Sequence, residues 1–129
     1  MAPLDLSAPG WQVKQGQAIW KPETKKPEIT GDIVLATNPN GTSYVQFSKT
    51  LPIVSAQTTS EGWAVEFPPE NKHYSGRGNG PKKIVWLQLL KVIEGRELGE
   101  YWQLVHPSSD FVALENEESG ERLEVHFQR

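Results

Sequence analysis

The chain contains no cysteine, and this absence removes several kinds of chemistry at once. Without a thiol there is no disulfide framework, no thiolate nucleophile and no cysteine-ligated metal site. Histidine is also scarce. The three histidines are His73, His106 and His126, and none lies at a metal-ligand spacing from another. We therefore predict no metal site and no cofactor.

Long apolar runs and basic tracts are missing as well. No stretch is long enough to cross a bilayer as a helix, and residues 1–6 lack the apolar core of a signal peptide. An export signal or lipid-attachment site would therefore have to precede Ala2 in the native protein. The 13 basic and 16 acidic residues give a formal net charge of −3. Nucleic-acid binding is not expected, because a phosphate backbone would meet no complementary surface.

Familiar catalytic and phosphate-binding motifs are absent too. Residues 106–110 hold the three residue types of a hydrolase triad, but in a turn-like run without a nucleophile elbow or an oxyanion motif. Residues 76–81 are rich in glycine and precede a predicted helix, yet their spacing fits neither common phosphate-binding loop. We predict no catalytic residue and no enzymatic activity.

The strongest positive signal is one apolar helix in a chain that otherwise reads as short strands. From Pro81 to Ile93, apolar residues recur at helical spacing and form a broad apolar face. Pro81 suits the first helical turn, and Gly95 suits the position after the last one. A helix this apolar has to pack against a concave apolar surface, such as the inner face of a curved sheet. It is then either part of a filled core or a lid over an apolar cavity.

Alternating apolar and polar residues, separated by turn-forming residues, predict eight or nine strands. Their short connecting loops predict antiparallel neighbours. The alternation loses phase near Gly16, which predicts a bulge or a sharp bend. An acidic cluster near the C-terminus predicts a solvated hairpin tip. The strands cover residues 11–20, 29–37, 43–48, 53–58, 63–67, 101–106, 111–116 and 122–127, with a further one starting near residue 73, and the acidic cluster consists of Glu115, Glu117, Glu118, Glu121 and Glu124.

These elements predict one mainly β (α+β) domain over residues 11–129, preceded by a flexible N-terminal tail at residues 1–10. The architecture is a curved antiparallel sheet or open β-barrel, with one amphipathic helix inserted mid-chain as core plug or lid. Five tryptophans are many for this length, and so much aromatic surface either fills the interior or lines a cavity for an apolar ligand. The predicted ligand-binding residues are Trp11, Trp20, Ile33, Leu35, Val45, Phe47, Trp63, Val65, Phe67, Trp86, Leu89, Leu90 and Ile93.

The order of these elements resembles the LolA/LolB-like lipoprotein-localisation family of bacterial periplasmic carriers and outer-membrane receptors. The resemblance covers most of residues 11–127 as a pattern of elements and not as a diagnostic motif. The chain departs from the family in being shorter and in showing one convincing helix where members have several. The likeness rests on an opening strand with Trp11, a hairpin of residues 31–35 and 44–47, a strand with Trp63, Val65 and Phe67, and a helix from Pro81 that contains Trp86 and Leu90.

The resemblance implies an open antiparallel barrel, closed by a helical lid, whose apolar cavity receives the acyl chains of lipoproteins. It also implies a location in the periplasm or an anchor in the outer membrane, with a lipid acyl chain or a lipoprotein as partner. In the receptor branch a loop between strands projects an apolar side chain toward the membrane. Leu51 occupies the matching loop here. The single helix implies a smaller lid and a smaller or more open cavity.

Two hypotheses of different classes follow. In the first, a monomeric, non-enzymatic envelope protein binds acyl chains or another apolar ligand in a half-barrel cavity, with a role in lipoprotein localisation, and its helix moves outward when ligand enters. In the second, a protein-interaction or structural module has a filled core and no ligand, and its partner meets an edge strand or the acidic hairpin. A tightly filled interior favours the module, and an apolar void favours the carrier. An enzyme for a small hydrophobic substrate would need His73 or His106 to face the cavity.

Overall fold

Nine antiparallel strands form one open sheet in the computed structural model of this protein, which describes residues 9–23 and 25–128. The strand order is β6-β5-β4-β3-β2-β1-β9-β8-β7, so β6 and β7 are the two edges. The mainly β class and the antiparallel sheet with one helix are confirmed, whereas closure into a barrel is not. The strands are β1 (Gln12–Lys21), β2 (Ile29–Thr37), β3 (Ser43–Lys49), β4 (Leu51–Thr58), β5 (Gly62–Phe67), β6 (Lys72–Arg77), β7 (Trp102–Ser108), β8 (Phe111–Asn116) and β9 (Arg122–Phe127), and a 3₁₀ helix, η1 (Pro68–Glu70), follows β5.

Most strand bounds agree with the alternation pattern. β2, β8 and β9 begin and end at the predicted residues. β1 begins one residue later than predicted, so Trp11 lies just outside the strand. β4 begins two residues earlier, at Leu51, because residues 51 and 52 still pair with the end of β3 after a register shift. Residues 1–8 of the predicted tail lie outside the described residues.

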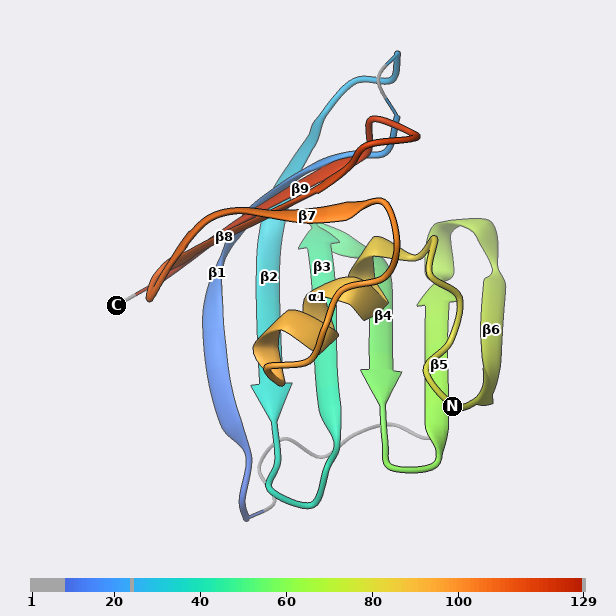
Figure 1. The fold of residues 1–129 in the computed structure, drawn as a ribbon, viewed down its shortest axis with the longest axis vertical. Coiled ribbons are helices and arrows are strands. Elements are labelled where there is room, and N and C mark those ends of the chain that lie inside the picture. The colour runs from blue at the N-terminus through green and yellow to red at the C-terminus, as the bar shows by residue number, and fades with distance from the viewer. Residues whose placement is uncertain (1–8, 24, 129) are drawn as a thin grey trace.

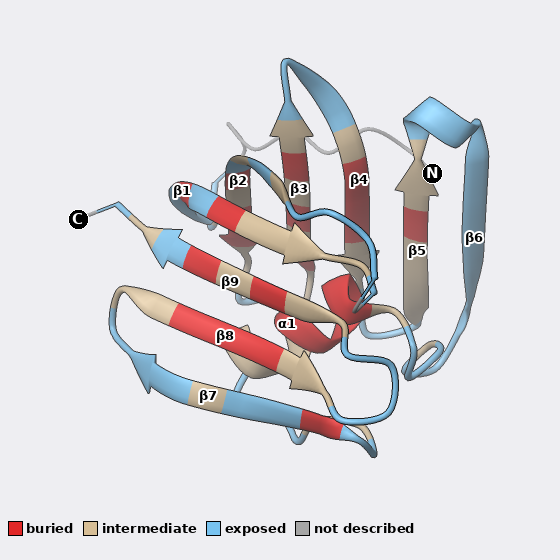
Figure 2. Ribbon diagram, turned by 90° about the horizontal axis from the view of Figure 1, so that it is seen from above, coloured by how far each residue is buried: buried red, intermediate tan, exposed pale blue. Residues whose placement is uncertain are grey.

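The sheet bends at β1, which pairs with strands on both of its sides. It pairs with β2 from Gln12 to Trp20 without a break in register, and with β9 from Gly16 to Lys21. Figures 1 and 2 show β2 to β6 as one wing, and β9, β8 and β7 as a second wing folded over it. The phase change at Gly16 therefore marks a bend and not a bulge. The bend needs glycine, because a Cβ there would lie 2.0 Å from the backbone oxygen of His126.

The helix α1 (Val85–Ile93) lies in the fold between the two wings. Figure 2 shows burial concentrated on α1 and on the middle of the strands, whereas β6 is exposed along its whole length. The side chains of Leu87, Leu89 and Leu90 are fully buried. Burying a large apolar side chain stabilises the fold by about 1.5–3 kcal/mol, so α1 is a major part of the core.

The helix begins four residues later than predicted, and the reason is tertiary. A helix starting at Pro81 would use the backbone oxygen of Lys82 for a hydrogen bond within the helix. Instead, that oxygen accepts hydrogen bonds from Trp102 Nε1 at 2.6 Å and from Gln88 Nε2 at 3.3 Å. Ile84 is consequently extended, with φ −86° and ψ 107°, and it caps the helix.

The C-terminal end of α1 agrees with the prediction from Gly95. This glycine adopts φ +74°, a left-handed conformation that L-residues with a Cβ rarely take. Its N–H donates to the backbone oxygen of Val92 at 3.0 Å, and the N–H of Arg96 donates to that of Lys91 at 2.8 Å. These two bonds form a Schellman motif, which satisfies carbonyl groups that the helix end would otherwise leave unpaired.

Candidate functional site

The structure brings most of the predicted ligand-binding residues into one core. Trp11 is the exception, because it is only partly buried and does not belong to the core cluster. Four others lie at the margin of the core and are partly buried. The fully buried members are Ile33, Leu35, Val45, Phe47, Val65, Trp86, Leu89 and Leu90, and the marginal ones are Trp20, Trp63, Phe67 and Ile93.

Three aromatic rings form the centre of this core. The ring of Trp86 stacks on Phe47 with centroids 5.2 Å apart, and Trp20 meets Trp86 edge-on at 5.3 Å. The indole Nε1 of Trp86 is buried and has no hydrogen-bond partner. A buried donor without a partner costs about 1–3 kcal/mol, so the core retains one unused polar group beside α1.

In this structure α1 is a core plug. Its buried residues run without a gap from Val85 to Leu90, and they contact both wings through the cluster that includes Leu114 and Leu123 on β8 and β9. A tightly filled interior favours the interaction module over a carrier with a preformed cavity. A ligand entering between the wings would have to displace part of the helix.

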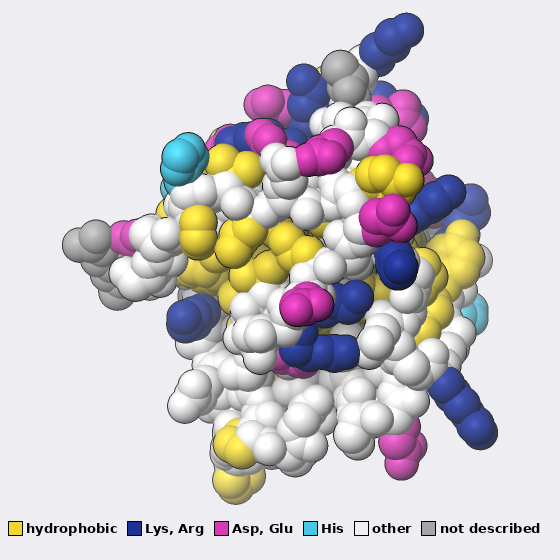
Figure 3. Space-filling model, in the orientation of Figure 1, with side chains coloured by type: hydrophobic (Ala, Val, Ile, Leu, Met, Phe, Trp, Pro, Cys, Tyr) yellow, Lys and Arg dark blue, Asp and Glu magenta, His cyan; other side chains and the backbone are white. Residues whose placement is uncertain are grey.

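Three apolar side chains at the margin of the interior are partly or largely exposed, and we call them the apolar mouth: Leu104, Phe127 and Ile93. Leu104 pairs with the core residue Leu114 across β7 and β8 and therefore faces inward, yet its exposed fraction is 40%. Phe127 and Ile93 are partly buried and pack against the core. Figure 3 shows hydrophobic side chains gathered across the middle of this face, where β7 and α1 lie in the same view of Figure 1. The ammonium group of Lys14 lies 5.4 Å from the centroid of the Phe127 ring.

Polar contacts hold both ends of α1. Glu94 Oε1 accepts hydrogen bonds from Ser43 Oγ at 2.6 Å and from Thr58 Oγ1 at 3.1 Å, which ties the C-terminal end to β3 and β4. The fully buried Gln88 accepts from the backbone N–H of Gly99 at 2.8 Å, in addition to its bond to Lys82. These contacts are specific but few, and each is worth about 1 kcal/mol net.

Glycines flank α1 on both sides. Gly78 and Gly80 precede it with φ +76° and +77°, and Gly95 follows it. Gly80 also lies where a Cβ would come within 2.8 Å of Leu87 Cδ1. Glycine permits backbone rotations that other residues resist, so these segments are suited to absorb a movement of the helix.

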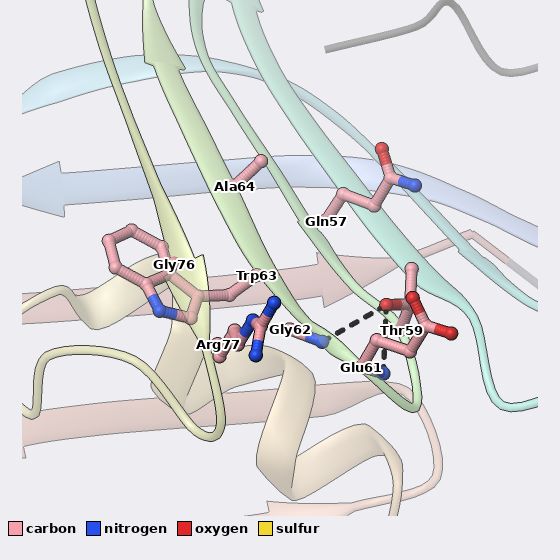
Figure 4. Close-up of a pocket in the computed structure, with 8 residues that line it drawn as sticks. All are labelled: Gln57, Thr59, Glu61, Gly62, Trp63, Ala64, Gly76 and Arg77. Carbon is pink, nitrogen blue, oxygen red and sulfur yellow. Dashed lines mark hydrogen bonds between the residues drawn. The ribbon is translucent and has the colours of Figure 1, made fainter.

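An open groove of about 680 Å³ lies elsewhere, along β4, β5 and β6. Figure 4 shows Trp63 turned toward Gly76 and away from Gln57. Thr59 Oγ1 accepts hydrogen bonds from the N–H groups of Glu61 and Gly62, each at 3.2 Å. The lining is Gln57, Thr59, Glu61, Gly62, Trp63, Ala64, Gly76 and Arg77, so Trp63 is the single predicted ligand-binding residue in it.

A second cavity, which we call the α1 cavity, has a volume of about 220 Å³ and lies against the helix itself. It contains hydroxyl groups, two cations and one carboxylate, together with one core side chain, Leu87. Its lining is Gly41, Thr58, Thr59, Ser60, Gly78, Asn79, Leu87, Lys91, Glu94 and Arg96. The sequence did not single out this set, because its members come from four separated segments.

The remaining candidates lie at the surface. Leu51 is 71% exposed at the start of β4, after Thr50 in a left-handed conformation. His73, His106 and His126 are all exposed, and none belongs to the core cluster. Within the described residues no group of three or more metal-ligating side chains forms. The described part of the chain also has no helix with the length and apolarity needed to span a membrane.

The acidic cluster is a solvated tip only at Glu117 and Glu118. The prediction is corrected for the other three members, Glu115, Glu121 and Glu124, which are partly buried. Glu121 is partly buried, and its Oε2 accepts a hydrogen bond from Trp20 Nε1 at 2.8 Å. Burial raises the pKa of Glu121 to about 7, the hydrogen bond from Trp20 opposes this rise, and the nearby charge of Glu23 adds to it. Glu115 and Glu124 both form ion pairs with Arg122.

No known protein-family model matches this sequence, and no curated protein matches it significantly.

Proposed function

We propose that this protein binds an acyl chain or a similar apolar ligand between the two wings of its sheet, with α1 as a displaceable plug. The observation that carries the proposal is the setting of α1. An almost wholly apolar helix fills a concave sheet, the side chains of the apolar mouth are partly exposed, and glycines flank the helix on both sides. The protein acts by binding and releasing its ligand, without catalysis.

The energies of the two states are of similar size. Four buried side chains of α1, Trp86, Leu87, Leu89 and Leu90, stabilise the filled state by roughly 6–12 kcal/mol at 1.5–3 kcal/mol each. An acyl chain gains about 0.8 kcal/mol for each buried CH₂ group, so a chain of 12 to 16 carbons gains about 10–13 kcal/mol. The ligand can therefore replace the helix with a small net change in free energy, and binding is a shift between two populations.

The unpaired indole of Trp86 weakens the closed state. Its Nε1 lies in the core without an acceptor. When α1 moves outward, this N–H reaches water, and the cost of leaving the donor unpaired is removed. Displacement of the helix by a ligand is therefore easier than the buried apolar area alone suggests.

The resemblance to LolA/LolB-like proteins suggests a cellular location and a source of the ligand. We propose that the protein works as a monomer in the periplasm or at the outer membrane, and that a lipoprotein supplies the acyl chain. The exposed side chain of Leu51 is suited to touch a membrane surface, since it is apolar and makes little contact with the rest of the protein.

The alternative is an interaction module, and the filled core is the observation that favours it. Here α1 would be a permanent core helix, and the partner would add a strand to the exposed edge β6. This alternative predicts that no apolar ligand enters between the wings.

Native mass spectrometry and fluorescence quenching separate the two functions. We expect the purified protein to carry fatty acid or phospholipid that organic solvent extracts. We also expect a fatty acid brominated in its chain to quench tryptophan emission when added to the extracted protein. The variant Trp86→Phe keeps the ring contact with Phe47 and should lose part of this quenching, because Trp20 lies 5.3 Å from the ring of residue 86 and is still quenched. A protein that is free of lipid and unquenched at saturating fatty acid would contradict the carrier function and leave the module.

A further inference from the structure

The α1 cavity opens beside the helix at the point where the core meets polar surface. Leu87, a fully buried core residue, forms part of its wall. The hydroxyl groups of Thr58, Thr59 and Ser60 line another part. By its share of liquid volume a water molecule takes about 30 Å³, so a cavity of about 220 Å³ has room for one small charged group and several waters.

The charges in this cavity are unequally paired. Glu94 is fully engaged, because its Oε1 accepts from Ser43 and Thr58 and its Oε2 lies 3.4 Å from Arg96 Nη1. Arg96 also donates to Asn79 Oδ1. Lys91 forms no ion pair with any residue that the structure describes. The lining of the cavity therefore has two positive charges, on Lys91 and Arg96, and one negative charge, on Glu94.

The surroundings of Lys91 disfavour its own positive charge. Partial burial, followed by the charges of Arg96 and Lys82, lowers the pKa of its ammonium group. An anion placed in the cavity beside Lys91 and Arg96 would relieve their mutual repulsion. Carboxylate and phosphate groups have this charge, and their oxygens can also accept from the hydroxyl groups of Thr59 and Ser60, whereas Thr58 already donates to Glu94.

Cationic and hydrophobic side chains adjoin on one face of the molecule. Figure 3 shows Lys and Arg side chains immediately beside the hydrophobic gathering in the middle of that face. The C-terminal half of α1 contributes to both, with Lys91 in the cavity and Ile93 at the mouth. Leu87 belongs both to the wall of the cavity and to the core, so a ligand chain that takes the place of Leu87 in the core begins at the cavity.

We propose that the α1 cavity binds the oxyanion head group of an amphiphile whose acyl chain lies between the wings, with Lys91 as the main contact. This inference rests on the proposed function and names its ligand class: single-chain anionic amphiphiles, with a carboxylate or a phosphate at the end of the chain. Neutral amphiphiles of the same chain length bind through the chain alone.

A comparison of matched ligands tests this. Hexadecanoate, hexadecyl phosphate and the uncharged hexadecanoyl glycerol are titrated below their aggregation limits, with inorganic phosphate as a chain-free arm. Displacement of a neutral dye gives the dissociation constants. We expect the wild type to bind the two anions about tenfold more tightly than the neutral ligand, the size of a hydrogen-bonded charge contact. We expect inorganic phosphate alone to bind weakly. The preference should fall as salt is raised.

The variants locate the site. Lys91→Gln should abolish the preference for anions and leave the neutral ligand within about twofold, and Lys91→Arg should restore it. Lys49→Gln is the matched control, because it removes one positive charge from the opposite end of β3, about 20 Å from Ser43. Equal affinity of the wild type for charged and neutral ligands would overturn the head-group site while leaving the carrier function intact. A preference that Lys91→Gln keeps and Lys49→Gln loses would also overturn it. Failure of all three chain-bearing ligands to bind would remove the proposed function, and this inference with it.

Discussion

Glu121 and Gln88 are two polar side chains that connect distant parts of the fold at single points. The carboxylate of Glu121 joins the start of β9 to Trp20 at the end of β1, and the buried amide of Gln88 joins the segments before and after α1. Each sits in an environment where removal of the partner leaves a buried polar group. At this scale, hydrogen bonds and protonation states decide local stability more than apolar area does.

Glu121 makes the stability of the protein depend on pH. Its pKa rises from the ordinary value of 4.5 to about 7 in the folded state, so the folded protein holds this proton more tightly than the unfolded chain. The contribution of Glu121 to stability is therefore full below about pH 4.5 and declines as the pH rises through 7. We expect Glu121→Gln, which keeps an oxygen for Trp20, to gain about 1–2 kcal/mol relative to wild type between pH 5 and pH 8, because the group is partly screened by water.

Urea unfolding at the two pH values checks this expectation. Glu118→Gln serves as the control, since it removes the same charge from an exposed position on the same hairpin. A free-energy difference between Glu121→Gln and wild type that is equal at both pH values would show that Glu121 does not titrate in this range.

At the scale of elements, α1 is held by a few polar contacts in addition to its apolar packing. Glu94 is the main contact at the C-terminal end, where it joins the helix to β3 and β4. The Schellman motif lets the chain reverse after it. If α1 is a displaceable plug, these contacts set how often it opens.

Removal of the Glu94 contact should raise the affinity for an uncharged apolar dye. Glu94→Ala loses two hydrogen bonds, which weakens the closed state by about 1–2 kcal/mol and multiplies the open population by roughly 5–30. The dissociation constant of a neutral dye such as Nile red should fall by a similar factor. Glu61→Ala is the control, because Glu61 is exposed and lies on the turn between β4 and β5. Unchanged dye binding in a folded Glu94→Ala protein would indicate that α1 does not open.

Sequence periodicity predicted the elements well where local pattern decides them. The bounds of β8 and β9 and the end of α1 at Gly95 depend on alternation and on one glycine, which are local signals. The start of α1 did not follow the pattern, because the carbonyl of Lys82 is taken by Trp102, twenty residues away. An apolar helix face has the same composition whether it plugs a core or covers a cavity, so the sequence left that choice open.

The candidate site was only half predictable for a related reason. The apolar residues of the core follow from their periodicity, and most of them meet as expected. Lys91, Glu94 and Arg96 do not form a recognisable sequence motif. They line a cavity only because the fold brings the turns containing Gly41, Thr59 and Asn79 next to them. The burial of Glu121 likewise depends on Trp20, which is 101 residues away in the chain.

At the scale of the whole molecule, β1 is the one strand that belongs to both wings. Its residues from Gly16 to Trp20 pair with β2 on one side and with β9 on the other. The second wing, β7 to β9, contributes Leu114, Leu123 and Val125 to the core and covers α1. The interior exists as a closed space only while this second wing stays folded over the first.

Gly16→Ala should destabilise the junction between the two wings by more than the addition of one methyl group would suggest. The new Cβ would lie 2.0 Å from the backbone oxygen of His126 and 2.8 Å from the Cα of Phe127, and neither atom can move without shifting β9. We expect the free energy of unfolding to fall by about 3 kcal/mol, with faster hydrogen exchange in β9 than in β3. Gly41→Ala is the matched control: it has φ +92° but no atom within 4 Å, so it should cost about 1 kcal/mol from backbone strain alone. Equal losses for the two variants, or uniform exchange across both wings, would mean that β1 does not hold the wings together at Gly16.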